Sequence, residues 1–331
     1  MDEERLEQLA QVAVWYFEDG IDQHTIAERI GLSRSMVSRM LSEARKMGIV
    51  TFRVDYPLHR DRESEQVLEQ LFGLDQAWVL SATPWSDEPS RTRILGKLVA
   101  RCLQSRLFDG IRIGVGVGYG VLEVIRAMPS LELRQAAVVQ LIGTLSSKQT
   151  EIDSAELTRL LSEKLHAESL HLPSPAIISS RATAQSLLHE RSIQQALDAA
   201  INVDVALIGI GSLAAERSSL VAVGVLSREE LEALTRAGAV ADLLWHYVDG
   251  TGEEVTASRE RHVIGIPLPA LREIPSVIAV AAGSESVDSI RAALRGRYVD
   301  VLVTDEETSR ELIEREAPGY ISARRCRGRR M

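Results

Sequence analysis

The sequence predicts an α/β protein in two parts, a small N-terminal helix-turn-helix domain of the winged type and a large Rossmann-like α/β domain. Residues 22–46 contain two short amphipathic helices with a glycine between them. From residue 76 onward, apolar runs typical of strands alternate with amphipathic helices. The length of 331 residues is too great for the first unit alone. We place the domains at 1–56 and 57–318, followed by a basic tail at 319–331.

The N-terminal domain is expected to start with an amphipathic helix over 5–19, which supports the two helices of residues 22–46. Gly31 fits the turn between them because glycine adopts a left-handed backbone at little cost. Leu32 is expected to enter the core after this turn, and Ser33 to cap the second helix. The apolar stripe expected on the second helix consists of Met36, Val37, Met40, Leu41 and Ala44.

The segment after the second helix predicts a strand. Residues 49–54 alternate and are rich in β-branched side chains, and Pro57 ends the run. This strand could form a wing beside the minor groove of DNA, with Arg53 toward a phosphate.

The polar face of the second helix is suited to double-stranded DNA. Arginine can bond a guanine through two nitrogens, and hydroxyls reach phosphates or bases. Residues 29–53 hold six basic side chains against one acidic side chain, in a chain of net charge −9. Such a basic island is typical of nucleic-acid contact, although an ordinary helical hairpin with a solvated face is the alternative. The candidate DNA contacts are Gln23, Ser33, Arg34, Ser35, Ser38, Arg39, Ser42 and Arg45.

The composition further restricts the class of protein and its cellular compartment. Two cysteines, Cys102 and Cys326, give neither metal-ligand spacing nor a disulfide framework, which fits a reducing cytoplasm. We therefore expect no metal and no cofactor. The acidic N-terminus lacks an apolar signal region, and no run of 18 apolar residues occurs. The expected protein is cytoplasmic and has no membrane partner.

The large domain is predicted to contain a parallel sheet. Near-continuous apolar runs such as residues 203–210 are typical of strands buried on both faces. Strands are predicted at 76–81, 111–116, 137–142, 168–172, 203–210, 240–247, 276–282 and 299–303. Helices are predicted at 61–72, 91–107, 119–128, 154–166, 182–200, 227–237, 285–295 and 306–315. Ser227 and Glu230 form a capping box that opens one of them.

A ligand site is expected where the strands end. Open parallel sheets bind ligands beyond the carboxyl ends of their strands. Gly, Ser, Thr or Asp follow five of the predicted strands, and exposed amides there can hold an anion. The glycines of residues 114–120 do not have the G-x-G-x-x-G spacing of dinucleotide-binding loops. The candidate effector contacts are Gly116, Gly118, Gly120, Gln140, Gly143, Thr144, Gly209, Gly211, Ser212, Asp242, Asp249, Gly283 and Ser286.

Over nearly its full length the chain resembles the SorC/DeoR-type family of bacterial sugar-binding transcriptional regulators. The matching segments are 22–50, 113–118, 140–143, 206–212, 238–242, 264–268, 277–281, 290–296 and 301–305. The resemblance implies a large domain similar to sugar-phosphate isomerases and glucosamine-phosphate deaminases. It also implies a phosphorylated sugar or a related metabolite as effector, and a homo-oligomer, dimer or tetramer, on operator DNA.

The chain departs from the family pattern at several ligand positions. Gly120 stands where Ser or Thr is usual, and Ser286 where Lys is common. Ala241 replaces a glycine, and Ile142 replaces the lysine that one member uses to bind its sugar covalently. Two anion contacts that the resemblance implies are therefore missing.

The indicated function is a DNA-binding transcriptional regulator of a carbohydrate-utilisation operon, with a sugar or sugar phosphate modulating its operator affinity, and not an enzyme. The alternative is a sugar-phosphate isomerase or deaminase with an appended DNA-binding domain. Carboxylates and a histidine near one strand end could transfer protons. The acid–base candidates of this alternative are Asp242, His246, Asp249, Glu253 and His262.

Overall fold

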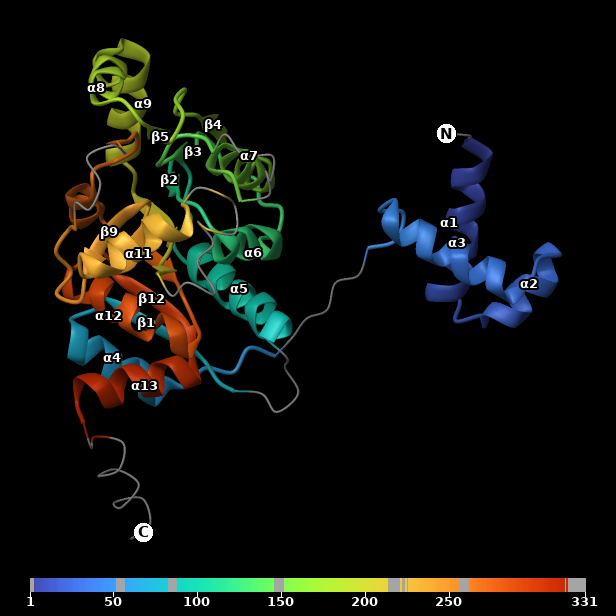
Figure 1. Cartoon of the computed structure of the whole chain (residues 1–331). Coiled ribbons are helices and arrows are strands. Elements are labelled where there is room, and N and C mark those ends of the chain that lie inside the picture. Colours follow the sequence, from blue (N-terminus) through green and yellow to red (C-terminus); the bar gives the residue numbers. More distant parts are fainter. Residues whose placement is uncertain are drawn as a thin grey trace, which may run out of the picture. The chain divides into compact units, whose positions relative to one another are not determined.

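The computed structural model describes residues 3–51, 57–82, 88–145, 152–213, 221, 224, 226–255, 262–318 and 320 (Figure 1). The chain divides into two compact units, Met1–Pro57 and Leu58–Met331, which are taken separately below. The boundary expected after residue 56 lies one residue before this division. The expected large domain is described with the gaps given above. Of the expected tail at 319–331, residue 320 alone is among the described residues. In the described parts of the chain, no helix has the length and apolar character needed to cross a membrane.

The first unit contains the three helices expected for it, α1 (Glu3–Phe17), α2 (Gln23–Ile30) and α3 (Arg34–Lys46). The carboxylate of Asp22 caps α2 by accepting the amides of the next turn. Gly31 ends α2 with φ +66°, which confirms the left-handed turn. The Ser33 hydroxyl accepts the Met36 amide at 3.3 Å, so Ser33 caps α3 as expected.

A small aliphatic core holds these helices together. Its buried members are Leu9, Val12, Ala13, Ile26, Ala27, Val37, Met40, Leu41 and Ala44. The expectation that Leu32 and Met36 join this core is wrong, because each exposes 42% of its surface. The buried stripe of α3 starts at Val37 and repeats at helical spacing, and Met36 lies just outside it.

The expected wing strand is wrong for its described part, residues 49–51, which form a bend and a coil. The amides of Ile49 and Val50 donate to the Ala44 carbonyl, and their side chains pack on the helical core. These β-branched residues thus end α3 instead of pairing with a strand. Arg53 lies outside the described residues.

The second unit contains a seven-stranded parallel sheet in the order β1-β12-β11-β6-β2-β3-β4. This confirms the buried parallel sheet expected from the apolar runs. The strands are β1 (Gln76–Leu80), β2 (Arg112–Val115), β3 (Ala137–Gln140), β4 (Glu168–Leu170), β6 (Val205–Gly209), β11 (Val277–Val280) and β12 (Val301–Asp305).

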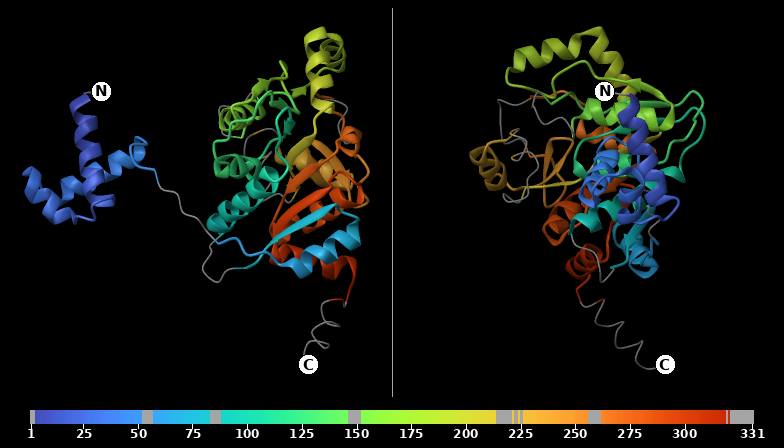
Figure 2. Two further views of the ribbon diagram at one scale, coloured as in Figure 1. Left: turned by 180° about the vertical axis from the view of Figure 1, so that it is seen from behind. Right: turned by 90° about the vertical axis from the view of Figure 1, so that its right-hand side faces the viewer.

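Helices cover both faces of this sheet (Figures 1 and 2). One face is covered by α5 (Glu88–Gln104), α6 (Tyr119–Ala127) and α7 (Ser154–Leu165). The other face carries α4 (Arg62–Phe72), α9 (Arg191–Ile201), α12 (Val287–Arg295) and α13 (Glu306–Glu316). Both faces are therefore buried, which explains the continuous apolar runs of the strands.

The outer edge of β1 is covered by its own neighbours in sequence. The Glu69 carboxylate accepts the Ala77 amide, and the Glu65 carboxylate accepts the Val79 amide, each at 2.9 Å. The Arg60 guanidinium donates twice to Glu65 and lies 3.5 Å from the centre of the Trp78 ring. The edge amides that face away from β12 thus find partners without another strand.

The expectation of one strand over 240–247 is wrong. The segment forms two antiparallel strands, β8 (Ala239–Leu243) and β9 (His246–Asp249), and β7 (Gly211–Ser212) pairs with β8. Leu244 and Trp245 form the two-residue turn between them, with φ of +52° and +66°. This small sheet lies outside the parallel sheet and brings Asp242 beside Gly211.

Two further differences concern the region between β4 and β6. The single helix expected over 182–200 is interrupted at Glu190, giving α8 (Arg181–His189) and α9. The break lets Ala184 and Ile193 both pack against Leu172 and Ile264. Two short strands, β5 (Ile177–Ile178) and β10 (His262–Val263), pair antiparallel and were not expected. The described part of the unit also contains α11 (Arg228–Arg236), η1 (Leu268–Glu273) and η2 (Ser284–Ser286), and α11 opens with the expected capping box.

Candidate functional site

The strand order fixes where a ligand can bind. The chain leaves β2 toward β3 on one side, whereas it leaves β6 toward β11 on the other side. The adjacent carboxyl ends of β2 and β6 therefore open a crevice at the point where the order reverses. The residues that follow these two strands are Val117–Gly120 and Ile210–Ser212.

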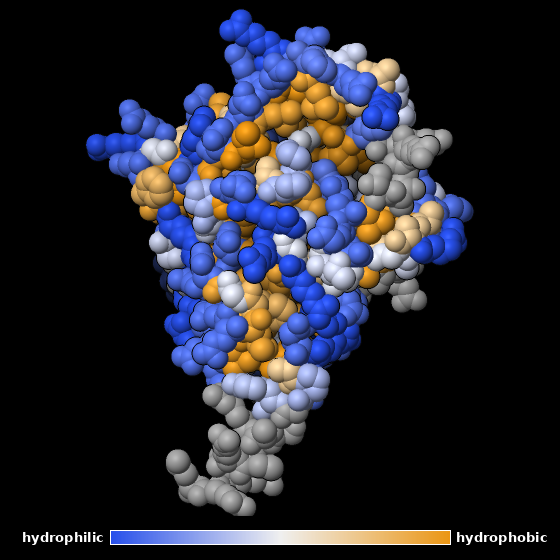
Figure 3. Space-filling model, turned by 90° about the vertical axis from the view of Figure 1, so that its left-hand side faces the viewer, coloured by the Kyte–Doolittle hydropathy of each residue, from blue (hydrophilic) through white to orange (hydrophobic). Residues whose placement is uncertain are grey.

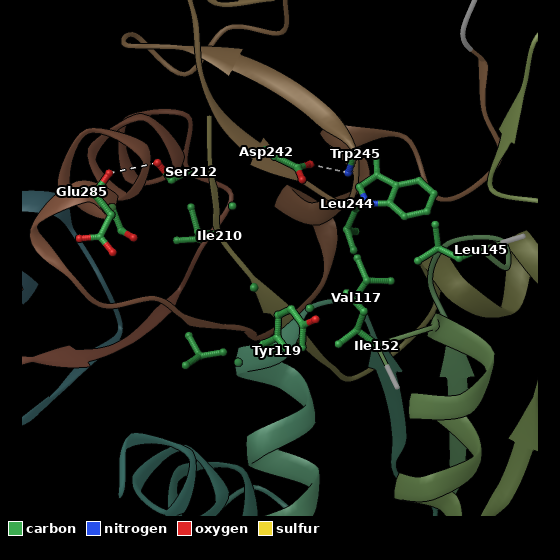
Figure 4. A pocket seen from close by; sticks show the side chains of 16 residues that line it. Val117, Tyr119, Leu145, Ile152, Ile210, Ser212, Asp242, Leu244, Trp245 and Glu285 are labelled. Atoms are coloured by element: carbon green, nitrogen blue, oxygen red, sulfur yellow. Dashed lines mark hydrogen bonds between the residues drawn. The ribbon is translucent and has the colours of Figure 1, made fainter. Parts of the chain in front are cut away.

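A cavity of about 210 Å³ lies at this crevice (Figure 4). We call it the switch-point cavity. Its walls come from the ends of β2 and β6, the β8–β9 turn and the segment after β11. The lining residues are Val117, Gly118, Tyr119, Gly120, Leu145, Ile152, Gly209, Ile210, Gly211, Ser212, Asp242, Leu244, Trp245, Val280, Glu285 and Ser286.

The N-terminus of α6 forms one wall of the switch-point cavity. Gly118 precedes this helix with φ +120°, a backbone conformation that residues with a side chain rarely adopt. The first amides of an α-helix have no partner within the helix and carry its positive dipole end. This wall can therefore hold the negative end of a ligand.

In the same wall of the cavity, Gly120 contributes no side chain. A Cβ atom built at Gly120 would lie 3.0 Å from Cγ1 of Val280. The Ser or Thr usual at this position in the resembling family would need Val280 to move. A glycine at position 120 thus leaves room for the side chain of Val280, the last residue of β11.

Asp242 is the buried carboxyl of the cavity. Its Oδ1 accepts the Trp245 amide at 2.7 Å, and only 8% of the residue is exposed (Figure 4). Burial raises the pKa of Asp242 from 3.8 to about 7, although the Trp245 amide and the nearby His246 oppose this rise. A half-protonated carboxyl at neutral pH can accept or donate a hydrogen bond to a ligand hydroxyl.

The turn that carries two cavity residues is strained. Leu244 and Trp245 both have positive φ, where a large side chain is disfavoured. Two-residue turns of this kind ordinarily contain Asn and Gly. Instead, Leu244 and Trp245 are buried and close the cavity on one side. Strain of this kind occurs at binding sites, where surrounding contacts hold it in place.

The described lining of the switch-point cavity contains two carboxyls, Asp242 and Glu285, and no lysine or arginine. A second cavity of about 390 Å³ adjoins it and shares Gly120, Val280 and Glu285 with it. Arg91 reaches this second cavity, where it pairs with Glu307 at 3.3 Å. The two carboxyls favour ligand hydroxyl groups near Asp242. An anionic group of a ligand would instead have the first amides of α6 as its partners.

The structure brings together eight of the thirteen residues expected to contact an effector. Gly118, Gly120, Gly209, Gly211, Ser212, Asp242 and Ser286 line the switch-point cavity, and Gly283 lines the adjoining one. The Ser212 hydroxyl donates to the Glu285 carbonyl across the cavity at 3.1 Å (Figure 4). Tyr119, Ile210, Leu244, Trp245, Val280 and Glu285 also line it and were not predicted from the sequence.

The other five residues lie outside both cavities and have structural contacts. Gln140 is buried and bonds Ile142, Ser154 and Leu172. Gly116 packs under Leu244, and Gly143 lies against the backbone of residues 174–176. Thr144 exchanges backbone hydrogen bonds with Ser174 and Ala176. The Asp249 carboxylate accepts amides within its own exposed turn.

The acid–base candidates of the enzyme alternative do not converge. Asp242 faces the switch-point cavity, and Asp249 and Glu253 belong to an exposed turn. Nδ1 of His246 lies 2.7 Å from Glu254 and Nε2 lies 3.2 Å from the Ile266 carbonyl, so both ring nitrogens are engaged. Among the described residues, Asp242 is the only one of these five in this cavity.

His246 and His262 line a separate groove of about 520 Å³ between α8, α11 and β9. Figure 3 shows apolar residues gathered in a hollow below the polar α8–α9 hairpin at the top of the view. Nε2 of His262 is buried there and has no hydrogen-bond partner in the described structure.

In the first unit, α3 presents a polar, cationic face. The expected DNA contacts on this helix, Arg34, Ser35, Ser38, Arg39, Ser42 and Arg45, are all exposed, as is Ser33, and Gln23 is half-buried. Glu43, the one acidic residue of α3, pairs with Arg5 of α1 at 2.7 Å. The Arg45 guanidinium lies over the Phe17 ring. The face that remains is positively charged.

Comparison with known proteins covers nearly the whole chain. Residues 56–314 match the protein-family model described as "Putative sugar-binding domain". Over 310 residues the chain is 32% identical to the transcriptional regulator LsrR of Enterobacter sp. (strain 638), covering 93% of each chain. It is 29% identical over 313 residues to the deoxyribonucleoside regulator of Bacillus subtilis (strain 168), covering 95% of this chain and 99% of that protein. The full-length sorbitol operon regulator SorC of Klebsiella pneumoniae matches 94% of this chain and 100% of its own, with a TM-score of 0.70 and 28% identity.

Proposed function

Since the chain belongs to the SorC/DeoR-type family of sugar-binding transcriptional regulators, we propose that α3 binds operator DNA and that a sugar in the switch-point cavity changes this binding. The observation that carries the proposal is the cavity at the ends of β2 and β6, which combines α6 amides with a buried carboxyl. The first unit is then a helix-turn-helix domain, and the protein works in the cytoplasm as a homo-oligomer, a dimer or tetramer.

The ligand we propose is a polyhydroxylated carbohydrate with an anionic end, such as a sugar phosphate. The first amides of α6 would hold the anion, since the described lining offers no basic side chain for it. Asp242 would bond a hydroxyl at the opposite wall. The Leu244 and Trp245 side chains would cover the apolar face of the sugar ring.

A thermal-shift screen against pentose and hexose phosphates, with the matching free sugars and polyols, tests this site. A ligand at about 100 times its dissociation constant should stabilise the protein by roughly 2.7 kcal/mol. We expect sugar phosphates to exceed the matching free sugars. If no member of the panel shifts the melting temperature, the proposed ligand class is wrong. If only free sugars do, the anion contact at α6 is wrong.

Selection of bound duplexes from a random-sequence DNA library tests the DNA contact. On the selected duplex, Arg39→Ala should weaken binding by roughly 1–3 kcal/mol and relax the sequence preference. Arg159→Ala is the matched control, because Arg159 is an exposed arginine of α7 in the other unit and pairs with Glu156. An equal loss for both variants would contradict the role of α3.

We propose that the chain has no catalytic activity, because Asp242 is the only one of the five acid–base candidates that lines the described cavity, and its described lining, which also includes the Glu285 carboxyl, contains no histidine or lysine. Turnover of any sugar phosphate that binds would revive the isomerase or deaminase alternative. Proton exchange into the bound ligand, followed by NMR in deuterated water, is the sensitive measurement.

A further inference from the structure

Two large apolar side chains are exposed where α3 begins. Leu32 lies in the turn before the cap residue Ser33, and Met36 lies in the first turn of the helix. Each exposes 42% of its surface, whereas the next apolar residue, Val37, is fully buried. The core of the first unit does not include them, so both side chains are available to a partner.

The surroundings of these two residues are cationic and hydroxylic. Arg34, Ser35 and Arg39 are exposed on the same end of α3. The acidic residue of this helix, Glu43, is already paired with Arg5. A second copy of this surface would bring like charges together, whereas a polyanion would be attracted. The charges therefore favour DNA as the occupant of the mixed apolar and cationic surface.

The major groove of DNA offers one apolar group, the C5-methyl of thymine. In a helix that enters this groove, the residues of its N-terminal turns reach the base edges. We infer that Leu32 and Met36 contact a thymine methyl in each operator half-site and so select thymine at one position. This inference rests on the proposed DNA binding. Methionine suits the contact because its unbranched side chain adapts to an irregular apolar surface.

Deoxyuridine substitution isolates this contact, since it removes the methyl group and leaves the base-pairing edge unchanged. The full chain would first be used to select a binding duplex from a random-sequence library. Each thymine of that duplex would then be replaced in turn by deoxyuridine, and affinities compared by fluorescence anisotropy at one salt concentration. We expect one position in each half-site to lose roughly fourfold in affinity, the contribution of about one buried methyl group.

The protein variants identify the residues that make the contact. Met36→Ala and Leu32→Ala should bind more weakly to the thymine duplex and no longer distinguish it from the deoxyuridine duplex. Both side chains are half-exposed, so the variants should keep the fold, which their thermal unfolding checks. Val14→Ala, at an exposed residue of α1 in the same unit, is the matched control and should keep the preference for thymine.

The outcomes separate this inference from the function on which it rests. A selected duplex whose affinity is unchanged by every deoxyuridine would overturn the thymine contact and leave DNA binding intact. Variants that bind both duplexes more weakly and still distinguish them as the wild type does would show that Leu32 and Met36 do not contact the thymine methyl group. Failure to select any duplex would overturn the DNA-binding function, and the thymine contact with it.

Discussion

Replacing Asp242 with asparagine should make the protein more stable and its sugar binding weaker. The asparagine oxygen can still accept the Trp245 amide, so the β8–β9 turn keeps its hydrogen bond. What the substitution removes is an ionisable group in a place where water is excluded. Burial raises the pKa of this carboxyl to about 7, against 3.8 in the unfolded chain.

The sign of the effect follows from where the proton is bound. Well below pH 4 the carboxyl is protonated in both the folded and the unfolded state. Between pH 4 and pH 7 the unfolded chain loses this proton while the folded protein keeps it, so stability falls as the pH rises through this window. A shift of about three pKa units corresponds to on the order of 4 kcal/mol lost by neutral pH. Asparagine avoids this loss entirely.

Urea unfolding of the wild type and Asp242→Asn at pH 5 and pH 7 measures the effect. The advantage of the variant should widen by roughly 2 kcal/mol over these two pH units. Asp249→Asn is the matched control, for which the expected change in stability has the opposite sign. The pKa of Asp249 is lowered by bonds from Thr251 and neighbouring amides, so its replacement should destabilise the protein at pH 7. That destabilisation should fade as the pH falls through the titration of Asp249.

The reasoning is refuted if Asp242→Asn gives the same change in stability at both pH values, or if it destabilises the protein at pH 7. Sugar binding is a separate readout on the same variant. An asparagine that stabilises the fold and leaves sugar affinity unchanged would remove Asp242 from the proposed ligand contacts while leaving its buried pKa intact. A gain in stability with a loss of affinity is the expected trade between the two properties.

Three further substitutions test the architecture by urea or thermal unfolding. Gly143→Ala should destabilise the second unit by roughly 1–3 kcal/mol, because its Cβ would lie 2.6 Å from the Ser174 carbonyl oxygen. An unchanged midpoint of unfolding would contradict this close approach. Ile26→Ala should cost the first unit roughly 2–5 kcal/mol, since Ile26 is fully buried between its helices, and it should leave sugar binding intact. Glu65→Gln should cost about 3 kcal/mol by leaving the half-buried Arg60 guanidinium without its carboxylate, and a loss confined to low salt would contradict burial of the pair.

The parallel sheet could be predicted because each of its strands is recognisable from a short segment of sequence. A strand buried on both faces needs apolar residues at every position, and Val205–Gly209 satisfies this without any alternation. The caps of α3 and α11 are equally local, since each depends on one side chain and the next turn of helix. The concentration of site residues after β2 and β6 followed from the same rule about strand ends.

The β8–β9 turn could not be predicted, because Leu244 and Trp245 lack every ordinary signal of a positive-φ turn. Their conformation is imposed by packing in the cavity wall, which no short window of sequence contains. This is also why two of the apolar cavity residues were missed. Met36 was misplaced for a related reason, since a stripe one residue wider than the true one fits the same helical period.

The covered edge of β1 has a consequence during synthesis on the ribosome. Gln76 of β1 pairs with Val301 of β12, so β1 has no sheet partner until more than two hundred further residues have been made. At about 5–20 residues per second, β1 waits for roughly 10–45 s. In this interval an uncapped apolar strand would be open to pairing with another nascent chain. Glu65 and Glu69, which precede β1 by only a few residues, can bond two of its amides as soon as it emerges. They leave the other edge of β1 free for the strand that arrives last.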